Sequence, residues 1–287
     1  MLDPRLHTFL TLCETMNYTR AAERLCLTQP AVTHHIHFLE QHYHVRLFSY
    51  QGKTLRLTEQ GIKLRDLVRP LWVNSEKIDE IMATPSPVFL RIGATRTIGE
   101  YCMAPLCSRF LRTHPGASFS LTVDNTQALL RLLEAGKLDF ALVEGFFDQS
   151  KYESRPLKQE SFFGICAPHH PLSGQKVALD TLLKERLFVR EAGSGTRAVL
   201  EQALRQQNRT VQHFASLTVV SDFSTIKALV ADGLGISFVY APVVEQDLQN
   251  HTLARFDLDT GPLWGTFSFV CLKNHVLASN FAEWTVE

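Results

Sequence analysis

The sequence contains no unbroken apolar stretch of about 18 residues and no basic segment followed by an apolar one at its start. A membrane-spanning helix requires the first feature, and a secretory leader requires the second. We therefore expect a cytoplasmic protein without membrane contacts. An excess of one charge is also missing, since 29 Lys and Arg balance 29 Asp and Glu. The overall charge therefore neither indicates nor excludes a nucleic-acid partner.

The sequence also lacks the spacings that identify common catalytic and metal-binding sites. Its six cysteines are scattered without metal-ligand spacing, and a reducing compartment keeps such cysteines as thiols. The run Gly193–Thr196 has no Lys-Ser/Thr ending and is therefore not a phosphate-binding Walker loop. Ser194 does not lie in a nucleophile elbow. We expect neither an enzyme nor a resident cofactor.

Two short helices joined by a tight turn are predicted between Asn17 and Glu40. The first covers Asn17–Leu25, where Thr19 is a residue of the capping type. The second starts at Thr28 and accepts Pro30, because the amides of a first helical turn have no partner within the helix. At 287 residues the chain has room for this small module and for a separate core of about 200 residues.

The second of these helices has one apolar and one polar face. Apolar side chains recur at the i, i+4 and i+7 positions and mark the buried stripe: Val32, Ile36 and Leu39. The opposite face carries side chains that form hydrogen bonds: Gln29, Thr33, His34, His37 and Gln41. Such a face suits the major groove of DNA, where base edges differ in donors and acceptors. An ordinary helical hairpin with a solvated face has the same periodicity.

Two strand-like runs follow, Val45–Phe48 and Thr54–Leu57, with a turn signal at Gly52. They predict a winged hairpin, in which Lys53 and Arg56 lie beside the DNA backbone. Residues 1–65 hold eight Lys or Arg and five Asp or Glu, so they carry +3 and the remainder carries −3. The basic character therefore lies with the predicted DNA-binding segment, although a solvated surface would look similar.

A long helix is predicted from Thr58 to about Ala83. At 1.5 Å per residue it is on the order of 38 Å long, too long to bury its intermittent apolar stripe on so small a module. It therefore requires a partner. The prolines of Thr84–Pro87 end the helix, and a new domain is expected from Val88.

Strand-like and helix-like segments alternate after Val88. The strand-like runs are 89–93, 119–123, 140–143, 187–190, 217–220 and 236–239. The helix-like runs include 99–112 and 126–135. This alternation predicts parallel sheets with helical crossovers, and the number of strand–helix units is enough for two α/β subdomains.

Hydroxyl-rich loops follow two of these strands, at Ala94–Thr97 and at Gly193–Arg197. Open parallel sheets bind ligands at the carboxyl ends of their strands, and helix N-termini favour anions. Arg96 can add a bidentate contact to a carboxylate or phosphate. Capping hydroxyls and turn-forming glycines would give the same sequence without a ligand. Asn125, Thr126 and Phe223 are weaker candidates, chosen because they begin facing helices.

Several segments together resemble the LysR-type transcriptional regulators. In the N-terminal region they are Ala21–Leu25, Thr28–Thr33, Val45–Phe48 and Leu57–Gly61. In the remainder they are His114–Gly116, Leu138–Val143, Gly193–Arg197 and Val230–Ile236. The resemblance spans nearly the whole chain. The sequence departs from the family at His44, where the family usually has Gly, and at Tyr50, where it usually has Arg.

The resemblance implies an α/β protein with an N-terminal all-α winged helix-turn-helix and an effector domain similar to periplasmic binding proteins. It places the DNA-binding domain at residues 1–58, a dimerisation helix and hinge at 59–87, and the effector domain at 88–287. Subdomain I would comprise 88–161 and 266–287, and subdomain II 162–265. The chain would cross between them near Glu160–Gly164 and near Leu263–Phe267.

The family also implies partners and site residues. Homodimers or homotetramers would bind a pseudo-palindromic site on double-stranded DNA and contact RNA polymerase, and a small effector, here expected to be anionic, would bind between the subdomains. The residues expected to contact DNA are Tyr18, Thr19, Arg20, Gln29, Pro30, Ala31, Thr33, His34, His35, His37, Lys53 and Arg56. The residues expected to contact the effector are Thr95, Arg96, Thr97, Asn125, Thr126, Ser194, Gly195, Thr196 and Phe223.

Two other functions stay open at this point. One is a small-molecule-binding protein or enzyme with an incidental helical N-terminal module. The other is a metal-responsive regulator built on clustered histidines, although no Cys or carboxylate accompanies them at ligand spacing. On DNA a protonated histidine would add positive charge, so we expect affinity to rise as the pH falls from about 8 to about 6.

Overall fold

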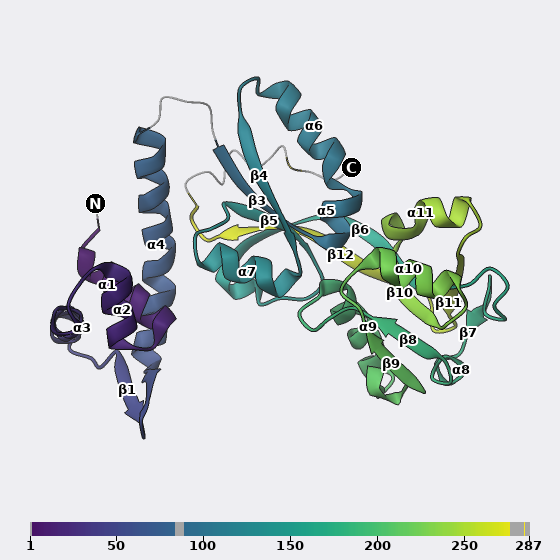
Figure 1. Ribbon diagram of the computed structural model, residues 1–287, viewed down its shortest axis with the longest axis horizontal. Coiled ribbons are helices and arrows are strands. Elements are labelled where there is room, and N and C mark those ends of the chain that lie inside the picture. The colour runs from purple at the N-terminus through teal and green to yellow at the C-terminus, as the bar shows by residue number, and fades with distance from the viewer. Residues whose placement is uncertain (1, 84–88, 276–283, 285–287) are drawn as a thin grey trace. The chain divides into compact units, whose positions relative to one another are not determined.

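The computed structural model describes residues 2–83, 89–275 and 284. The chain divides into a smaller N-terminal unit and a larger second unit (Figure 1). The predicted hinge at Thr84–Pro87 and the expected domain start at Val88 lie outside the described residues. No helix among the described residues is long and apolar enough to cross a bilayer.

Three helices form most of the N-terminal unit: α1 (Pro4–Thr15), α2 (Tyr18–Leu25) and α3 (Gln29–Tyr43). Thr28 caps α3 as predicted, because its hydroxyl accepts from the Ala31 amide. The cap of α2 differs from the prediction. Asn17, not Thr19, holds this position, and its side-chain oxygen accepts from the amides of Thr19 and Arg20. The extended backbone at Asn17 places that oxygen over the first turn.

The apolar stripe predicted on the second helix is confirmed. Val32, Ile36 and Leu39 of α3 are each at most 2% exposed and belong to the core of this unit. They pack with buried residues of α1 and α2, among them Phe9 and Ala21. The polar face of α3 is therefore turned away from the core.

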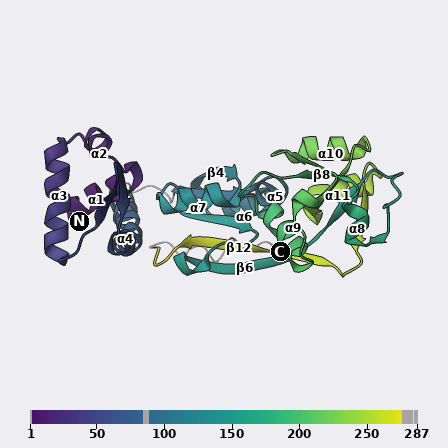
Figure 2. The same cartoon turned by 90° about the horizontal axis from the view of Figure 1, so that it is seen from below.

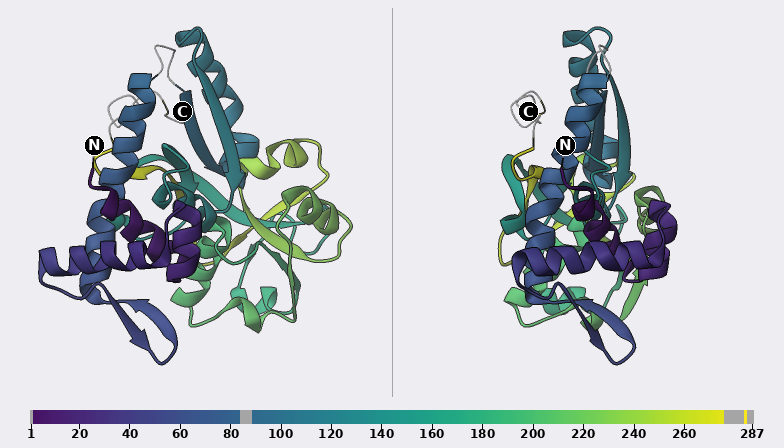
Figure 3. Two further views of the ribbon diagram at one scale, coloured as in Figure 1. Left: turned by 60° about the vertical axis from the view of Figure 1, so that its left-hand side comes forward. Right: turned by 90° about the vertical axis from the view of Figure 1, so that its left-hand side faces the viewer.

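β1 (Phe48–Gln51) and β2 (Thr54–Leu57) form the predicted hairpin, which projects from the helices of this unit (Figure 3). β1 begins at Phe48, later than predicted, since Val45–Leu47 stay outside the strand. Gly52 turns the chain with a φ of 63°, which glycine adopts without steric cost. α4 (Glu59–Ala83) follows and continues through Pro70.

The second unit is built on one sheet with the strand order β4-β3-β5-β12-β6-β10-β8-β9, to which β11 and β7 attach. The strands are β3 (Phe89–Thr95), β4 (Ser118–Asp124), β5 (Phe140–Glu144), β6 (Tyr152–Cys166), β7 (Lys176–Val177), β8 (Arg186–Val189), β9 (Ser216–Val219), β10 (Ile236–Tyr240), β11 (Ala254–Leu258) and β12 (Leu263–Leu272). Two parallel groups, β4-β3-β5 and β10-β8-β9, confirm two α/β subdomains, called I and II below.

The long strands β6 and β12 lie side by side and run through both subdomains (Figure 2). They pair antiparallel from Leu263 opposite Phe162 to Leu272 opposite Tyr152. β12 also pairs with β5 of subdomain I, and β6 pairs with β10 of subdomain II. The segments predicted to cross between subdomains fall within this ribbon. The sequence did not predict that each belongs to one continuous strand.

Helices cover the sheet at α5 (Arg96–Tyr101), α6 (Met103–Thr113), α7 (Thr126–Glu134), α8 (Leu179–Leu182), α9 (Gly195–Gln206), α10 (Phe223–Ala231) and α11 (Ala241–Gln249). The single helix predicted from Gly99 to Arg112 is instead two helices, α5 and α6. The first begins directly at Arg96, because β3 continues to Thr95. α5, α7, α9 and α10 each begin shortly after a strand ends, so their N-termini gather at the carboxyl ends of the strands.

Candidate functional site

The start of α2, the start of α3 and the β1–β2 hairpin enclose a groove of about 400 Å³ on the N-terminal unit. Its polar lining consists of Asn17, Tyr18, Thr19, Gln29, Tyr50 and Lys53. Helix N-termini and a lysine give this groove a cationic character, which suits the phosphate backbone of DNA.

Most of the residues expected to contact DNA are exposed: Thr19, Arg20, Gln29, Pro30, His34, His37, Lys53 and Arg56. Tyr18, Ala31 and Thr33 are half-buried. The side-chain amide of Gln29 donates to the Thr33 hydroxyl at 3.0 Å, so these two side chains are held together on the outer face of α3. Tyr50 is 66% exposed in the hairpin.

His35 differs from the neighbouring histidines of α3. Its Nδ1 lies 2.9 Å from the hydroxyl of Thr8, a buried residue of α1. This contact ties α3 to α1 and gives the half-buried His35 a packing role, while its contact with DNA stays a prediction. His34 and His37 are exposed, and His37 Nδ1 lies 3.5 Å from the Glu40 carboxylate.

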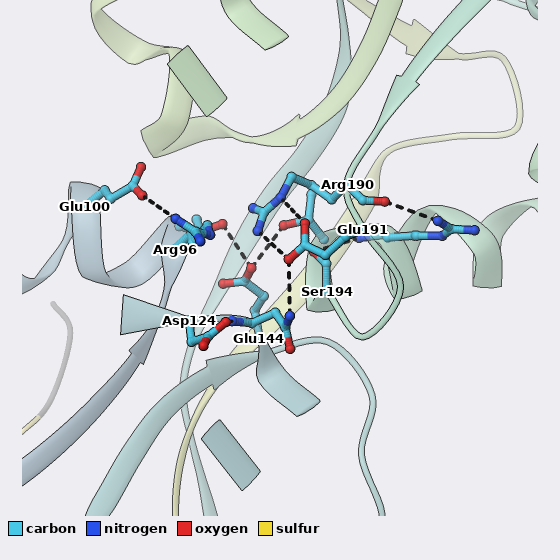
Figure 4. Close-up of polar contacts among 11 residues, drawn as sticks. Arg96, Glu100, Asp124, Glu144, Arg190, Glu191 and Ser194 are labelled. Carbon is cyan, nitrogen blue, oxygen red and sulfur yellow. Dashed lines mark hydrogen bonds and ion pairs between the residues drawn. The ribbon is translucent and has the colours of Figure 1, made fainter. Parts of the chain in front are cut away.

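In the second unit a buried carboxyl group lies where the two subdomains meet. Glu144, the last residue of β5, is 1% exposed (Figure 4). Its carboxyl group accepts three hydrogen bonds from threonines. Thr95 Oγ1 donates to Oε2 at 2.5 Å. Thr97 Oγ1 and Thr196 Oγ1 each donate to Oε1 at 3.0 Å. Three of the predicted effector contacts therefore donate to a side chain of the protein itself.

Burial raises the pKa of the Glu144 carboxyl above its ordinary value, because a charge is poorly solvated inside the protein. The three threonine hydroxyls lower it and offset part of this effect. The positive charge of Arg190 lowers it further. The centre of the cleft is therefore a carboxyl group stabilised mainly by neutral donors.

Arg190 is itself buried and committed to neighbours. Its Nε and Nη2 donate to the Glu191 carboxylate at 2.9 and 3.0 Å (Figure 4). Its guanidinium lies 4.6 Å from the centre of the Phe223 ring. Glu191 also accepts from the Asn125 side chain at 3.3 Å, which links the subdomains. Phe223 is 0% exposed, and its ring packs against Arg190 in this structure; a direct effector contact from this ring stays a prediction.

The backbone around Glu144 is closely packed, both within subdomain I and against subdomain II. Its carbonyl oxygen accepts from Thr126 Oγ1 at 2.9 Å. A Cβ atom on Gly195 would lie 2.1 Å from the same oxygen, so only glycine fits there. The Gln127 amide donates to the Gly193 carbonyl at 3.2 Å. Ser194 caps α9 by accepting from the Arg197 amide.

Arg96, predicted as an anion ligand, is only partly engaged. It lies 3.7 Å from Glu100 on the same helix. Its Nε is buried and has no hydrogen-bond partner among the described residues. One donor of this side chain is therefore unused at the start of α5.

A cavity of about 370 Å³ opens beside this centre, between the start of α7, the loop after β5 and the start of α9. Three predicted effector residues line it, namely Thr126, Ser194 and Gly195. Further lining residues are Phe146, Phe147, Lys151, Arg197 and Glu201. Its size and its mixture of aromatic and charged walls suit a small organic molecule.

The sequence pointed to the two loops that meet here but missed the acid between them. Glu144 ends an otherwise apolar strand, and an ionisable side chain at the carboxyl end of a buried strand was the available signal. Arg190, a charged residue directly after the buried strand β8, gave the same kind of signal and was also missed. Among the described residues, no group of three or more His, Cys, Asp or Glu is placed to hold a metal ion.

Comparisons with known proteins agree with this architecture. Residues 89–287 match the LysR substrate binding domain, and residues 4–62 match the bacterial regulatory helix-turn-helix proteins of the lysR family. The RuBisCO operon transcriptional regulator of Allochromatium vinosum is 29% identical over 262 residues, covering 90% of this chain and 85% of the relative.

Solved structures show the same fold. Full-length OxyR from Pseudomonas aeruginosa superimposes with a TM-score of 0.64 at 20% identity, over 99% of this chain and 93% of that chain. The Synechocystis CcmR regulatory domain, in complex with 2-PG, superimposes with a TM-score of 0.60 at 22% identity, over 68% of this chain and 94% of that chain. The chain thus belongs to the LysR family of helix-turn-helix transcriptional regulators.

Proposed function

We propose that this regulator binds its operator as a homodimer or homotetramer and that a small anionic effector, held between its subdomains, changes how it binds. The cavity of about 370 Å³ carries this proposal, because its walls come from α7 of subdomain I and α9 of subdomain II. Lys151 supplies a cationic group in these walls, which also hold Asp148 and an ion pair between Arg197 and Glu201. Phe146 and Phe147 supply apolar surface.

On DNA, α3 would lie in the major groove. Gln29, Thr33, His34 and His37 would face the base edges, where side-chain hydrogen bonds read the sequence. Lys53, with Arg56 and the start of α2, would contact phosphates, which adds affinity and fixes position without reading bases. The groove lined by Asn17, Tyr18 and Lys53 supports this arrangement.

Dimerisation through α4 is part of the proposal. Large apolar side chains of this helix are exposed: Ile62, Leu67, Leu71, Ile78, Ile81 and Met82. Exposed apolar side chains in this number are expected to be covered by a partner, here α4 of a second copy. Two-fold pairing of recognition helices suits a pseudo-palindromic operator. Contact with RNA polymerase is proposed from the family alone.

The effector can act only if it binds one arrangement of the subdomains more tightly than another, since a ligand with equal affinity shifts no equilibrium. A molecule that touches both α7 and α9 meets this condition, because its contacts depend on the distance between the two helices. A change in that distance would then alter the spacing of the recognition helices in the oligomer.

A thermal-shift screen of the full-length protein tests the effector part of the proposal. The panel comprises small carboxylates, phosphates, sulfur oxyanions, amino acids and aromatic acids. A ligand of the native state raises the Tm, and Lys151→Ala should lose the effect, whereas Lys184→Ala, outside the cavity lining, should keep it. DNA affinity is measured separately by fluorescence anisotropy at several salt concentrations. No shift from any compound, with salt-dependent DNA binding intact, would refute the anionic effector.

A further inference from the structure

We propose that Glu144 is a tethered ligand: its side chain fills a carboxyl-binding site formed by Thr95, Thr97 and Thr196 and holds the two subdomains together when no effector is bound. This inference concerns the regulation of the proposed effector cleft and rests on that function. Its test requires neither an effector nor DNA. The tether and the proposed function can therefore be refuted independently of each other.

The site has the donor geometry of a carboxyl-binding pocket. Three hydroxyls converge on the two oxygens of Glu144 at 2.5 to 3.0 Å. Thr95, Thr97 and Thr196 are each at most 2% exposed, so these donors have been removed from water together with their acceptor. A buried hydroxyl left without its partner costs free energy, which makes an empty site unfavourable. The site is therefore built to be occupied.

The contacts of Glu144 cross between the subdomains. Glu144, Thr95 and Thr97 come from β5, β3 and α5 of subdomain I, whereas Thr196 lies in the first turn of α9 in subdomain II. One oxygen of the carboxyl group, Oε1, accepts from both sides, through Thr97 and Thr196. Separation of the subdomains breaks the bond from Thr196. The chain thus supplies a contact that a bound molecule would otherwise have to make.

No cation is paired directly with this carboxyl group among the described contacts. The guanidinium of Arg190 acts on it through its charge but donates its hydrogen bonds to Glu191. Glu144 is held by neutral hydroxyls, which would hold a free carboxylic acid or carboxylate of the same size equally well. Truncation of the side chain should therefore leave a site that a detached small carboxylate can enter.

Chemical rescue of Glu144→Ala by formate tests this directly. The full-length variant should melt at a lower temperature than the wild type, and sodium formate should raise its Tm in a saturable manner, with half-maximal effect in the millimolar range or weaker because so small a ligand makes few contacts. Sodium chloride at equal ionic strength should not raise the Tm of this variant. The wild type, whose site is filled, should gain no more from formate than from chloride.

Glu134→Ala is the matched control. It removes another carboxylate of the same subdomain, which accepts from the Tyr152 hydroxyl at 2.7 Å, but it leaves the site of Glu144 intact. It should be destabilised without formate rescue. Equal responses of Glu144→Ala to formate and chloride, or an equal rescue of Glu134→Ala, would overturn the proposal.

Thr196→Val keeps the test decisive if Glu144→Ala does not fold. Valine has nearly the shape of threonine but cannot donate, so this change removes the hydrogen bond from Thr196 to Glu144 and leaves the other contacts between the subdomains in place. Backbone amides in the first turn of α9 should then exchange with deuterium several-fold faster than in the wild type. Thr113→Val, whose hydroxyl bonds locally at the end of α6, should leave α9 unchanged. Unaltered exchange in α9 of Thr196→Val would refute the tether.

Discussion

Gly195 touches the backbone of Glu144 so closely that a Cβ atom on the glycine would lie 2.1 Å from the Glu144 carbonyl oxygen. Gly195 does not have a left-handed backbone, so this position requires space and not conformational freedom. Gly195→Ala should therefore push α9 away from β5 and lower the free energy of unfolding by about 1–3 kcal/mol. Urea unfolding of the second unit measures this change.

Gly174→Ala separates this effect from ordinary backbone strain. Gly174 has a φ of 72°, but a Cβ atom there would contact nothing within 4 Å. Its substitution should lower stability through the left-handed turn alone and leave hydrogen exchange at the start of α9 unchanged. If Gly195→Ala exchanges at α9 no faster than Gly174→Ala, the close approach does not hold the subdomains together.

Much of the fold could be predicted because its signals are local. The stripe Val32, Ile36 and Leu39 fixes the buried face of α3 within a few residues, and the alternation of strands and helices fixes the two subdomains. The cap at Asn17 was missed because Asn and Thr are both residues that cap helices. Which of them holds the cap position depends on the backbone conformation at each residue. A single sequence does not decide between Asn17 and Thr19.

The site was predicted less well because its contacts are distant in sequence. Thr95 and Thr196 were identified from the hydroxyl-rich loops that contain them. Their common acceptor Glu144 lies 49 residues from Thr95 and 52 residues from Thr196 in the sequence. The sequence therefore predicted that both hydroxyls donate to an effector and did not show that they donate to Glu144. The sequence likewise does not show that the guanidinium of Arg190 lies over the ring of Phe223.

Substitutions in the N-terminal unit should separate base reading from phosphate contact. Gln29→Ala should cost about 1–3 kcal/mol on the preferred operator and relax sequence preference, whereas Lys53→Ala should weaken all duplexes alike and reduce the salt slope by about one. Anisotropy titrations with an operator selected from a random library, and with an unrelated duplex, measure both effects. Equal loss on both duplexes for Gln29→Ala would remove it from the base-reading set.

The exposed apolar side chains of α4 provide a test of oligomerisation. Leu67 and Leu71 are 60% and 54% exposed, so a charged substitution there does not disturb the core of the unit. Leu71→Arg should convert the oligomer to smaller species and weaken operator binding, because a buried charge opposes association. Analytical ultracentrifugation measures this, with Lys63→Arg, a conservative change on the same helix, as the control. An unchanged oligomer would exclude this face as the interface.

His44 should be replaceable by glycine with a gain in stability. It ends α3 with a φ of 54°, and its amide donates to the Gln41 carbonyl, as at a helix C-terminus that favours glycine. A left-handed conformation costs a residue with a Cβ atom roughly 1–2 kcal/mol, so His44→Gly should stabilise the N-terminal unit by about 1 kcal/mol. His42→Gly, within α3, should instead destabilise it by about 1 kcal/mol. Thermal unfolding compares the two, and a loss of stability in His44→Gly would contradict the assignment.

The pH dependence of stability should report on Glu144. Burial raises its pKa in the folded protein above the value of 4.5 that it has when unfolded. Between these two values the carboxyl group of Glu144 binds more protons in the folded state than in the unfolded state, so its contribution to stability falls as the pH rises through this window. Among the described residues, Arg190, Tyr240 and Cys102 are ionisable groups that interact electrostatically with this charge.

Glu144→Gln removes the titrating group while keeping an acceptor for the threonines. The Tm of the second unit, followed from pH 4.5 upward, should therefore decline less steeply in this variant than in the wild type. Glu134→Gln, which retains Glu144, should follow the wild-type profile. Parallel profiles for Glu144→Gln and the wild type would contradict this prediction. They would mean that Glu144 has the same pKa in the folded protein as in the unfolded chain, because its three hydroxyl donors together compensate for its burial.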